Sequence, residues 1–153
     1  MRLLLIAVGR RLPGWAREGF EHYRRLLPPE LQLQLHEIAH ARGGTAQLQK
    51  RREGSAILAA LPRQAHVVAF DEHGSQLDSR ELAAQLEHWQ NLGREIALVI
   101  GGPDGLDRDC LARADQIVAL SRLTLPHALA RVVVAEALYR ACSMVRGLPY
   151  HRA

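Results

Sequence analysis

Three short segments place glycine, proline and polar residues directly after runs of apolar residues, a pattern typical of ligand sites at the end of a sheet. They are residues 70–74 (FDEHG), residues 101–105 (GGPDG) and residues 121–126 (SRLTLP). Glycine lets the backbone approach a ligand closely, and proline stiffens a turn. In the third segment, backbone groups can bind an adenine edge or a ribose while Leu123 and Leu125 pack against the ring. The segments predict a site for a small organic ligand; a tight turn and a buried crossover are the competing interpretations.

Several common chemistries lack their usual sequence patterns. The GGPDG segment matches neither a dinucleotide-binding G-x-G-x-x-G fingerprint nor a P-loop, and residues 121–126 contain no carboxylate that could hold a ribose hydroxyl. The histidines form no HExxH motif, and His36, His40 and His66 lack a matched set of cysteines or carboxylates. No G-x-S-x-G motif is present. These observations argue against hydride transfer, ATP chemistry, a bound metal ion and a serine nucleophile.

Candidate acid–base and RNA-binding side chains gather in the last part of the chain. His127 and Arg131 lie four residues apart, on one face of a helix, where histidine can exchange protons near neutral pH or simply cap the helix. A structural role for Arg131 is an equal alternative. Further on, aromatic and cationic side chains follow one another: Tyr139, Arg140, Arg146, Tyr150, His151 and Arg152. Aromatic rings stack on unpaired bases and guanidinium groups hold phosphates, so this cluster favours RNA over a metal or a lipid. A solvated, partly disordered tail is the alternative.

These residues must be positioned by alternating strands and helices. Continuous apolar runs at residues 3–8 and 96–100 predict strands that are buried on both faces, and the alternation at residues 31–35 predicts a strand nearer an edge. Further strands are expected at residues 66–70 and 116–120. Helices are expected from Pro13 to Leu27, from Thr45 to Gly54 with a second piece at 55–61, from Asp78 to Gly93, from Asp107 to Ala114 and from Pro126 to Arg146.

The order of elements predicts an α/β fold with a mostly parallel sheet and helices on both faces. In such sheets ligands bind at the carboxyl ends of the strands, which is where the three segments lie. A length of 153 residues with no visible linker or repeat favours one domain over residues 1–153.

Charge is distributed in blocks along the chain. Residues 1–69 carry 11 basic and 5 acidic side chains, residues 70–119 carry 4 and 10, and residues 120–153 carry 5 and 1. The densest basic cluster is residues 50–52 (KRR). Lys50 is the single lysine of the sequence, and all other lysine-or-arginine positions are arginine. Basic ends indicate an anionic partner, although a solvated surface explains them equally well.

The sequence also predicts the cellular compartment. No apolar stretch approaches the roughly 20 residues that cross a membrane, and the first apolar run of about six residues is shorter than a signal peptide requires. Cys110 and Cys142 make no disulfide framework and no metal-binding spacing. We therefore expect a cytoplasmic protein without a membrane partner.

Four motifs resemble one family along nearly the whole chain. They are RLLLIAVG at residues 2–9, IGGPDGL at 100–106, LSRLTLPHALARVVVAEALYRA at 120–141 and PYHR at 149–152. Together they resemble the RlmH family of bacterial 23S ribosomal RNA pseudouridine methyltransferases, which belong to the SPOUT class. The resemblance implies a trefoil knot near the carboxyl end, a homodimer, and S-adenosylmethionine bound in a bent conformation by the knot loops.

The resemblance also implies site residues and a reaction. The cofactor would contact Phe70, Gly102, Ser121, Arg122, Leu123, Thr124, Leu125 and Pro126, although an aliphatic residue is expected in place of Phe70. The methyl group would go to ring nitrogen 3 of a pseudouridine on the ribosome. His127 or His151 would assist removal of the imide proton, Arg131 and Arg152 would hold RNA phosphates, and Tyr150 would stack on the base or position it.

Two alternative interpretations of the function remain open. One is a module of this fold that docks on ribosomes without catalysis. The other is a small-molecule methyltransferase or nucleotide-binding enzyme of unknotted topology. The basic ends and the terminal Tyr150-His151-Arg152 favour RNA over small molecules, and the intact cofactor segments favour catalysis over docking.

Overall fold

The computed structural model describes residues 1–152, with the backbone alone at Arg152. The strands are β1 (Arg2–Val8), β2 (Gln32–Ile38), β3 (His66–Gln76), β4 (Ile96–Ile100) and β5 (Gln116–Ala119). The helices are α1 (Gly14–Leu26), α2 (Ala46–Ala60), α3 (Ser79–Asn91), α4 (Arg108–Arg113) and α5 (His127–Arg146), followed by a 3₁₀ helix, η1 (Pro149–Arg152). Strands and helices alternate, as the sequence predicts.

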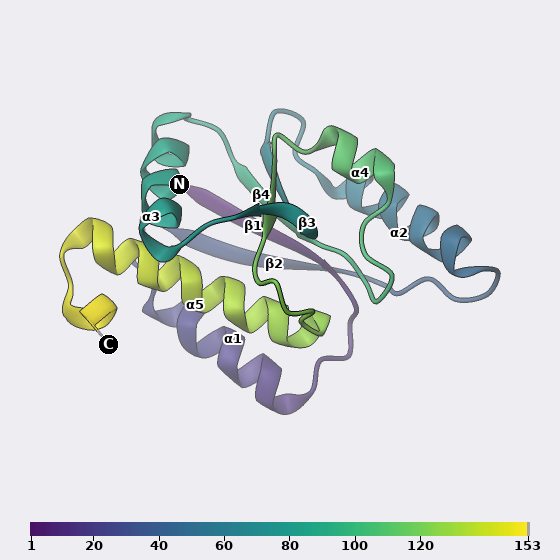
Figure 1. The fold of residues 1–153 in the computed structure, drawn as a ribbon, viewed down its shortest axis with the longest axis horizontal. Helices are drawn as coiled ribbons and strands as arrows, with labels where there is room; N and C mark the ends of the chain where they lie inside the picture. The colour runs from purple at the N-terminus through teal and green to yellow at the C-terminus, as the bar shows by residue number, and fades with distance from the viewer. Residues whose placement is uncertain (153) are drawn as a thin grey trace.

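The five strands form one parallel sheet in the order β2-β1-β4-β3-β5. Helices α1, α3 and α5 pack on one face, around Phe20, Trp89 and Leu138, whereas α2 and α4 cover the other face through Ile57 and Cys110. Figure 1 shows the two layers on opposite sides of the sheet. This architecture confirms the predicted fold class.

Burial explains which strand takes which place. Every residue of β4 is buried, because β4 lies between β1 and β3 and is covered by helices on both faces. The alternating sequence of β2 suits its position at the edge, since its glutamines Gln32 and Gln34 point to solvent while Leu33 is buried. The edge position predicted for this strand is therefore confirmed.

Two elements differ from the sequence prediction because of contacts with distant segments. Helix α2 continues through Gly54, where the sequence predicted a break. A Cβ on Gly54 would lie 2.8 Å from the Cβ of Asp107, so the glycine lets α2 pack closely against the start of α4. Strand β3 runs beyond Phe70 to Gln76, with a register shift against β5 between Phe70 and Ser75. The first candidate segment is thus a bulged continuation of a strand.

The helix ends follow the expected signals. Thr45 accepts a hydrogen bond from the backbone N–H of Leu48 at the start of α2, and Asp78 and Glu81 form a reciprocal capping box at α3. Gly147 ends α5 in the left-handed conformation. Gly147 thus sets the end of α5, from which the carboxyl-terminal residues continue.

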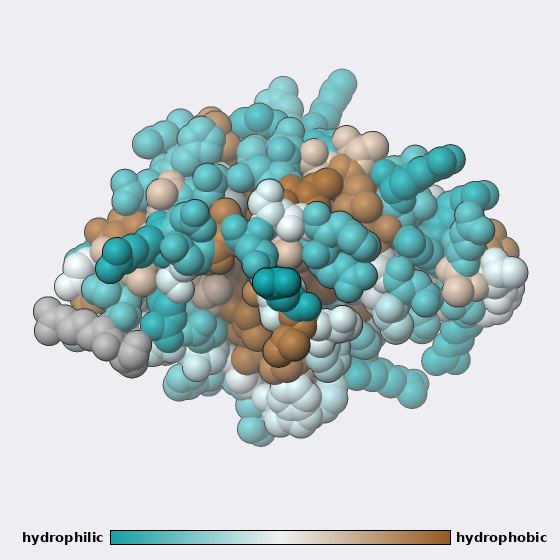
Figure 2. Space-filling view, viewed as in Figure 1, coloured by the Kyte–Doolittle hydropathy of each residue, from teal (hydrophilic) through white to brown (hydrophobic). Residues whose placement is uncertain are grey.

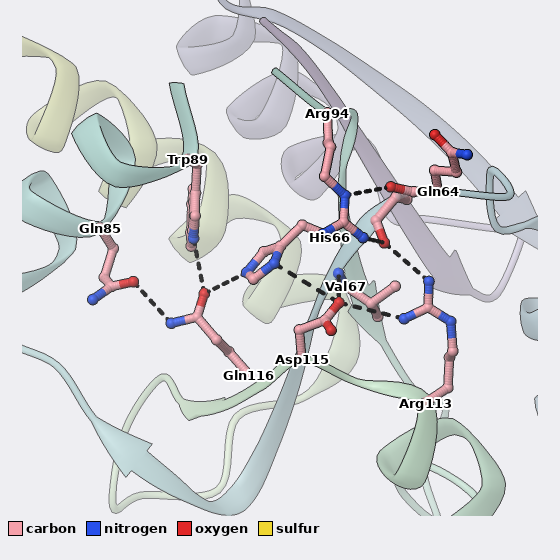
Figure 3. A network of polar contacts seen from close by, with 10 residues as sticks. Gln64, His66, Val67, Gln85, Trp89, Arg94, Arg113, Asp115 and Gln116 are labelled. Atoms are coloured by element: carbon pink, nitrogen blue, oxygen red, sulfur yellow. Dashed lines mark hydrogen bonds and ion pairs between the residues drawn. The ribbon is translucent and has the colours of Figure 1, made fainter. Parts of the chain in front are cut away.

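A polar network ties the sheet together at the amino ends of β3 and β5 (Figure 3). The side-chain oxygen of Gln116 accepts a hydrogen bond from the Trp89 indole and lies 2.8 Å from Nε2 of His66. Asp115 accepts a bond of 2.8 Å from the backbone N–H of Val67. The network lies at the edge opposite the candidate segments, so His66 has a structural role in the sheet.

Candidate functional site

The three candidate segments meet at the carboxyl edge of the sheet around one cavity of about 940 Å³. Residues 70–73 come from β3, residues 100–106 from the β4–α4 turn, and residues 120–127 from the β5–α5 loop and the first turn of α5. Among the predicted cofactor contacts, the cavity is lined by Phe70, Gly102, Ser121, Leu123, Thr124, Leu125 and Pro126. Arg122 is exposed and does not line it.

Glycines make the β4–α4 turn possible. The N–H of Gly105 donates to the carbonyl of Gly102 at 3.0 Å, and Gly105 has a φ of +83°. A Cβ on Gly101 would lie 2.7 Å from the carbonyl carbon and oxygen of Gly105, closer than real Cβ contacts come. The turn therefore folds tightly on itself, and its glycines leave backbone groups open to the cavity.

The β5–α5 loop presents apolar side chains beside polar backbone. Ser121 Oγ accepts a hydrogen bond from the N–H of Leu123 at 2.9 Å, which bends the loop. Leu123 is 76% exposed, whereas Leu125 packs against the core. Figure 2 shows apolar surface in the centre of this face, with hydrophilic surface around it. An apolar wall with backbone donors and acceptors suits a flat heteroaromatic ring.

His127 lines the cavity and lies against the end of β1. A Cβ on Gly9 would lie 3.3 Å from His127 Nε2. Burial lowers the pKa of His127, and the positive charges of Arg131 and His40 lower it further, against an opposite effect of Glu53. The imidazole is consequently neutral at pH 7, the form that can accept a proton.

Arg131 has a different place from the one that the sequence predicts. Its side chain is 0% exposed and forms an ion pair of 2.7 Å with Glu37. The same guanidinium donates to the carbonyl of Gly9 at 2.6 Å and to that of Val8 at 3.2 Å. With no exposed surface, it has no face to offer an RNA phosphate. We therefore reassign Arg131 from RNA contact to positioning of the end of β1.

A buried carboxylate near the cavity was not predicted. Glu53 is 5% exposed, and its Oε2 pairs with Nδ1 of His40 and accepts from the N–H of Ala41 at 3.0 Å. Its other oxygen faces the β4–α4 turn, since a Cβ on Gly102 would lie 2.9 Å from Oε1. The available signal was spacing, because Glu53 shares the buried stripe of α2 with Gly54 and Ile57.

The carboxyl-terminal residues pack against the other end of α5. The Tyr150 hydroxyl donates to Glu136 at 3.2 Å, and its ring lies edge-on to Tyr139 and beneath the guanidinium of Arg140. Burial, followed by Tyr23 and Glu136, raises the pKa of Tyr150 to about 12, so its hydroxyl stays protonated. Glu136 lies nine residues after His127, about 14 Å along the helix, and Tyr150 does not line the cavity of its own chain.

The other two predicted residues of the tail, His151 and Arg152, are not placed at the cavity. His151 does not line the cavity, and its Nδ1 is buried without a hydrogen-bond partner among the described residues. The side chain of Arg152 lies outside the described residues. The structure therefore does not bring His127 and His151 of one chain together.

The described residues contain neither a membrane-spanning helix nor a metal-binding cluster. Within residues 1–152, no helix has the length and apolar character needed to cross a membrane. The same part of the chain contains no cluster of three or more histidine, cysteine or carboxylate side chains that could hold a metal ion.

Comparison with known proteins gives consistent matches. Residues 1–151 match the model of a family described as "Predicted SPOUT methyltransferase". The chain is 46% identical over 156 residues to "Ribosomal RNA large subunit methyltransferase H" of Burkholderia cenocepacia (strain HI2424) and of Burkholderia ambifaria (strain MC40-6), covering 100% of each chain.

Solved structures share the fold at lower identity. TrmJ from Z. mobilis ZM4 aligns with a TM-score of 0.56 and 16% identity, over 90% of this chain and 69% of that chain. A structure described as "Structural insights into the 2-OH methylation of C/U34 on tRNA" aligns with a TM-score of 0.53 and 20% identity, over 95% and 97%. These two likenesses concern the fold alone.

Proposed function

Because the chain belongs to the SPOUT methyltransferase family, we propose that it methylates ring nitrogen 3 of a pseudouridine in bacterial 23S ribosomal RNA, using S-adenosylmethionine. The observation that carries this proposal is the 46% identity, over the full length of both chains, to proteins named for methylation of large-subunit ribosomal RNA. We assign this activity to residues 1–153 as one domain, in the cytoplasm.

The cavity fits the cofactor in size and chemistry. Its volume of about 940 Å³ lies within the range of roughly 300–1,000 Å³ that small-molecule sites occupy. Phe70, Leu123 and Leu125 would pack on the adenine, while the backbone of the β4–α4 turn and β5–α5 loop would bind its polar edge. When bound, S-adenosylmethionine supplies an electrophilic methyl group on its sulfonium. No metal ion is needed for this transfer.

His127 is the proton acceptor that we favour. Methyl transfer to an imide nitrogen requires alignment of that nitrogen with the methyl group and removal of one proton. His127 lines the cavity, and its lowered pKa keeps it neutral near pH 7. His151 is the second candidate, which in this conformation would have to come from another copy of the chain.

The pH dependence of the reaction tests this assignment. The single-turnover rate at saturating RNA is expected to be constant around neutral pH and to fall as the pH decreases through the lowered pKa of His127, below its ordinary value of 6.5. The rate falls because the protonated imidazole cannot accept a second proton. His127→Ala should remove this acidic limb, whereas His88→Ala, an exposed change on α3, should keep it. An unchanged rate profile in both His127→Ala and His151→Ala would lead us to abandon the histidine base.

We also propose a homodimer. Exposed apolar side chains lie on α1, at Trp15 and Leu26, and near the end of the adjacent α5, at Val145 and Leu148, where they suit a second copy. We further propose that a partner brings its own Tyr150 to the cavity, since Tyr150 of the same chain does not line it. The trefoil knot implied for the family stays a prediction.

Radiolabelled S-adenosylmethionine tests the function directly. The label is expected in the large-subunit RNA after incubation with ribosomes from a strain that lacks the modification, and nuclease digestion should locate it on a methylated pseudouridine. Ribosomes that already carry the methyl group are the control and should accept none. Label found only in small metabolites would instead support a small-molecule methyltransferase. Ribosome binding without detectable cofactor binding would support a docking module.

A further inference from the structure

The basic side chains at the two edges of the sheet differ in whether they have partners within the protein. At the amino edge, basic side chains are satisfied by the protein itself. Arg2 pairs with Glu95 at 3.3 Å, Arg113 pairs with Asp115 at 3.3 Å, and Arg94 donates to the carbonyl of Gln64 at 2.6 Å. Figure 3 shows Arg94 and Arg113 turned inward onto these groups. These guanidinium groups therefore serve the fold.

At the carboxyl edge, basic side chains over β1 and β2 are free of carboxylate partners. We define the β1–β2 cation surface as six side chains from the loops after these strands and the first turns of α2: Arg10, Arg11, Arg42, Lys50, Arg51 and Arg52. Among the described residues, none of the six forms an ion pair. All are exposed except Lys50, which is half-buried at the wall of the cavity.

Backbone contacts hold this surface together. The N–H of Gly9 donates to the carbonyl of Ile38 at 2.7 Å, which places the loops after β1 and β2 side by side. Arg52 donates to the carbonyl of Arg42 at 3.3 Å, which ties α2 to the loop before it. The cations thus belong to neighbouring segments, although they are spread over more than 40 residues of sequence.

Nearby carboxylates do not neutralise these cations. Glu37 is engaged by the buried Arg131, and Glu53 by His40 and the backbone of Ala41. Exposed acidic side chains lie instead on the other half of the edge, at Glu72 after Phe70 and at Asp104 and Asp109 near the β4–α4 turn. Arg108 is exposed beside these carboxylates, but the three carboxylates outnumber it. A polyanion approaching the cavity is therefore attracted more strongly over β1 and β2 than over β3 and β4.

We propose that the β1–β2 cation surface binds the phosphodiester backbone of the RNA that flanks the target nucleotide. This inference rests on the proposed function, because it takes ribosomal RNA as the substrate. The surface borders the cavity at Lys50, so an RNA strand held there leaves one unpaired base free to enter the cavity mouth. Arginine suits this role because its planar fork matches phosphate oxygens in two places.

Two double variants test the surface: Arg42→Ala/Arg51→Ala and Arg10→Ala/Arg11→Ala. Both leave Lys50, at the cavity wall, and Arg52, which holds the α2 loop, unchanged. The control is Arg63→Ala/Arg80→Ala, which removes the same charge from the loop before β3 and from α3, on the other face of the sheet from α2. Binding is measured by co-sedimentation with large ribosomal subunits and with protein-free 23S RNA across a salt series.

Each test variant is expected to weaken binding about tenfold and to flatten the slope of log K against log salt by about 1.4–1.8, since each phosphate contact contributes about 0.7–0.9. The control should match the wild type, and the affinity for S-adenosylmethionine should be unchanged in all variants. Wild-type binding and slope in both test variants would overturn the inference. A defect seen with whole subunits but absent with protein-free RNA would overturn it as well, by assigning the surface to a ribosomal protein.

The two proposals fail separately. Co-sedimentation reports on RNA binding without methyl transfer, so the surface is tested even if the wild type modifies no RNA. Conversely, normal methylation by variants with normal binding would leave the proposed function standing while removing this surface from it.

Discussion

Replacing Arg131 with methionine is expected to lower the free energy of unfolding by about 3 kcal/mol. The side chain of Glu37 is 32% exposed, so most of this cost comes from the carbonyl acceptors that lose their donor, at about 1–3 kcal/mol each. Methionine fills much of the volume but supplies no donor. Glu37 would lose its 2.7 Å partner, and the carbonyls of Val8 and Gly9 would lose the guanidinium that now satisfies them. Because these carbonyls lie at the end of β1, the change would also loosen the wall against which His127 rests.

Urea unfolding at one fixed protein concentration measures this effect. Arg146→Met is the matched control, because Arg146 lies on the same helix and pairs with Glu30 at the surface, where such pairs contribute at most about 1 kcal/mol. Adding Glu37→Gln to Arg131→Met should restore part of the lost stability by removing the unpaired charge. A cost for Arg131→Met as small as that for Arg146→Met would contradict the role given to the buried guanidinium.

Replacing Gly101 with alanine is expected to weaken the binding of S-adenosylmethionine about 10–100-fold. The new Cβ would lie 2.7 Å from the backbone of Gly105 and 3.0 Å from the N–H nitrogen of Leu106, and backbone atoms cannot swing away as a flexible side chain can. Overpacking of this kind costs about 1–3 kcal/mol, and here it must open the turn that lines the cavity. A change of about 1.4 kcal/mol alters the dissociation constant tenfold.

Titration calorimetry with S-adenosylmethionine gives the dissociation constant for each variant. The control is Gly14→Ala in the first turn of α1, where a Cβ meets nothing within 4 Å and φ is not positive. That change should leave cofactor affinity at the wild-type value. Equal affinities of Gly101→Ala and the wild type would show that the β4–α4 turn is not part of the cofactor site.

Local patterns predicted most of the fold. The apolar runs of β1 and β4, the capping box of α3 and the glycine that ends α5 each depend on neighbouring residues, so they could be read without knowing the rest of the molecule. Parallel strands joined by helices then required the candidate segments to lie at one edge of the sheet.

The two differences between the predicted and the observed elements, in α2 and β3, have a common cause. Gly54 weakens a helix on its own, yet α2 continues through it because the glycine lets the helix contact Asp107, more than 50 residues away. Likewise, β3 passes Phe70 because β5 offers it a second, shifted register. In both cases a contact between distant segments outweighs the local preference, which is the information that a sequence window does not contain.

The sequence by itself determined the layers of the fold, the three segments that surround the cavity and the family to which the chain belongs. Only the tertiary structure decided what individual charges do. Arg131 and Arg51 are the same residue type, but Arg131 is enclosed by the end of β1 and Glu37, whereas Arg51 lies exposed among other cations. The role of an ionisable group depends on its desolvation and on its neighbours in space, and these are set by packing between segments that are distant in the chain.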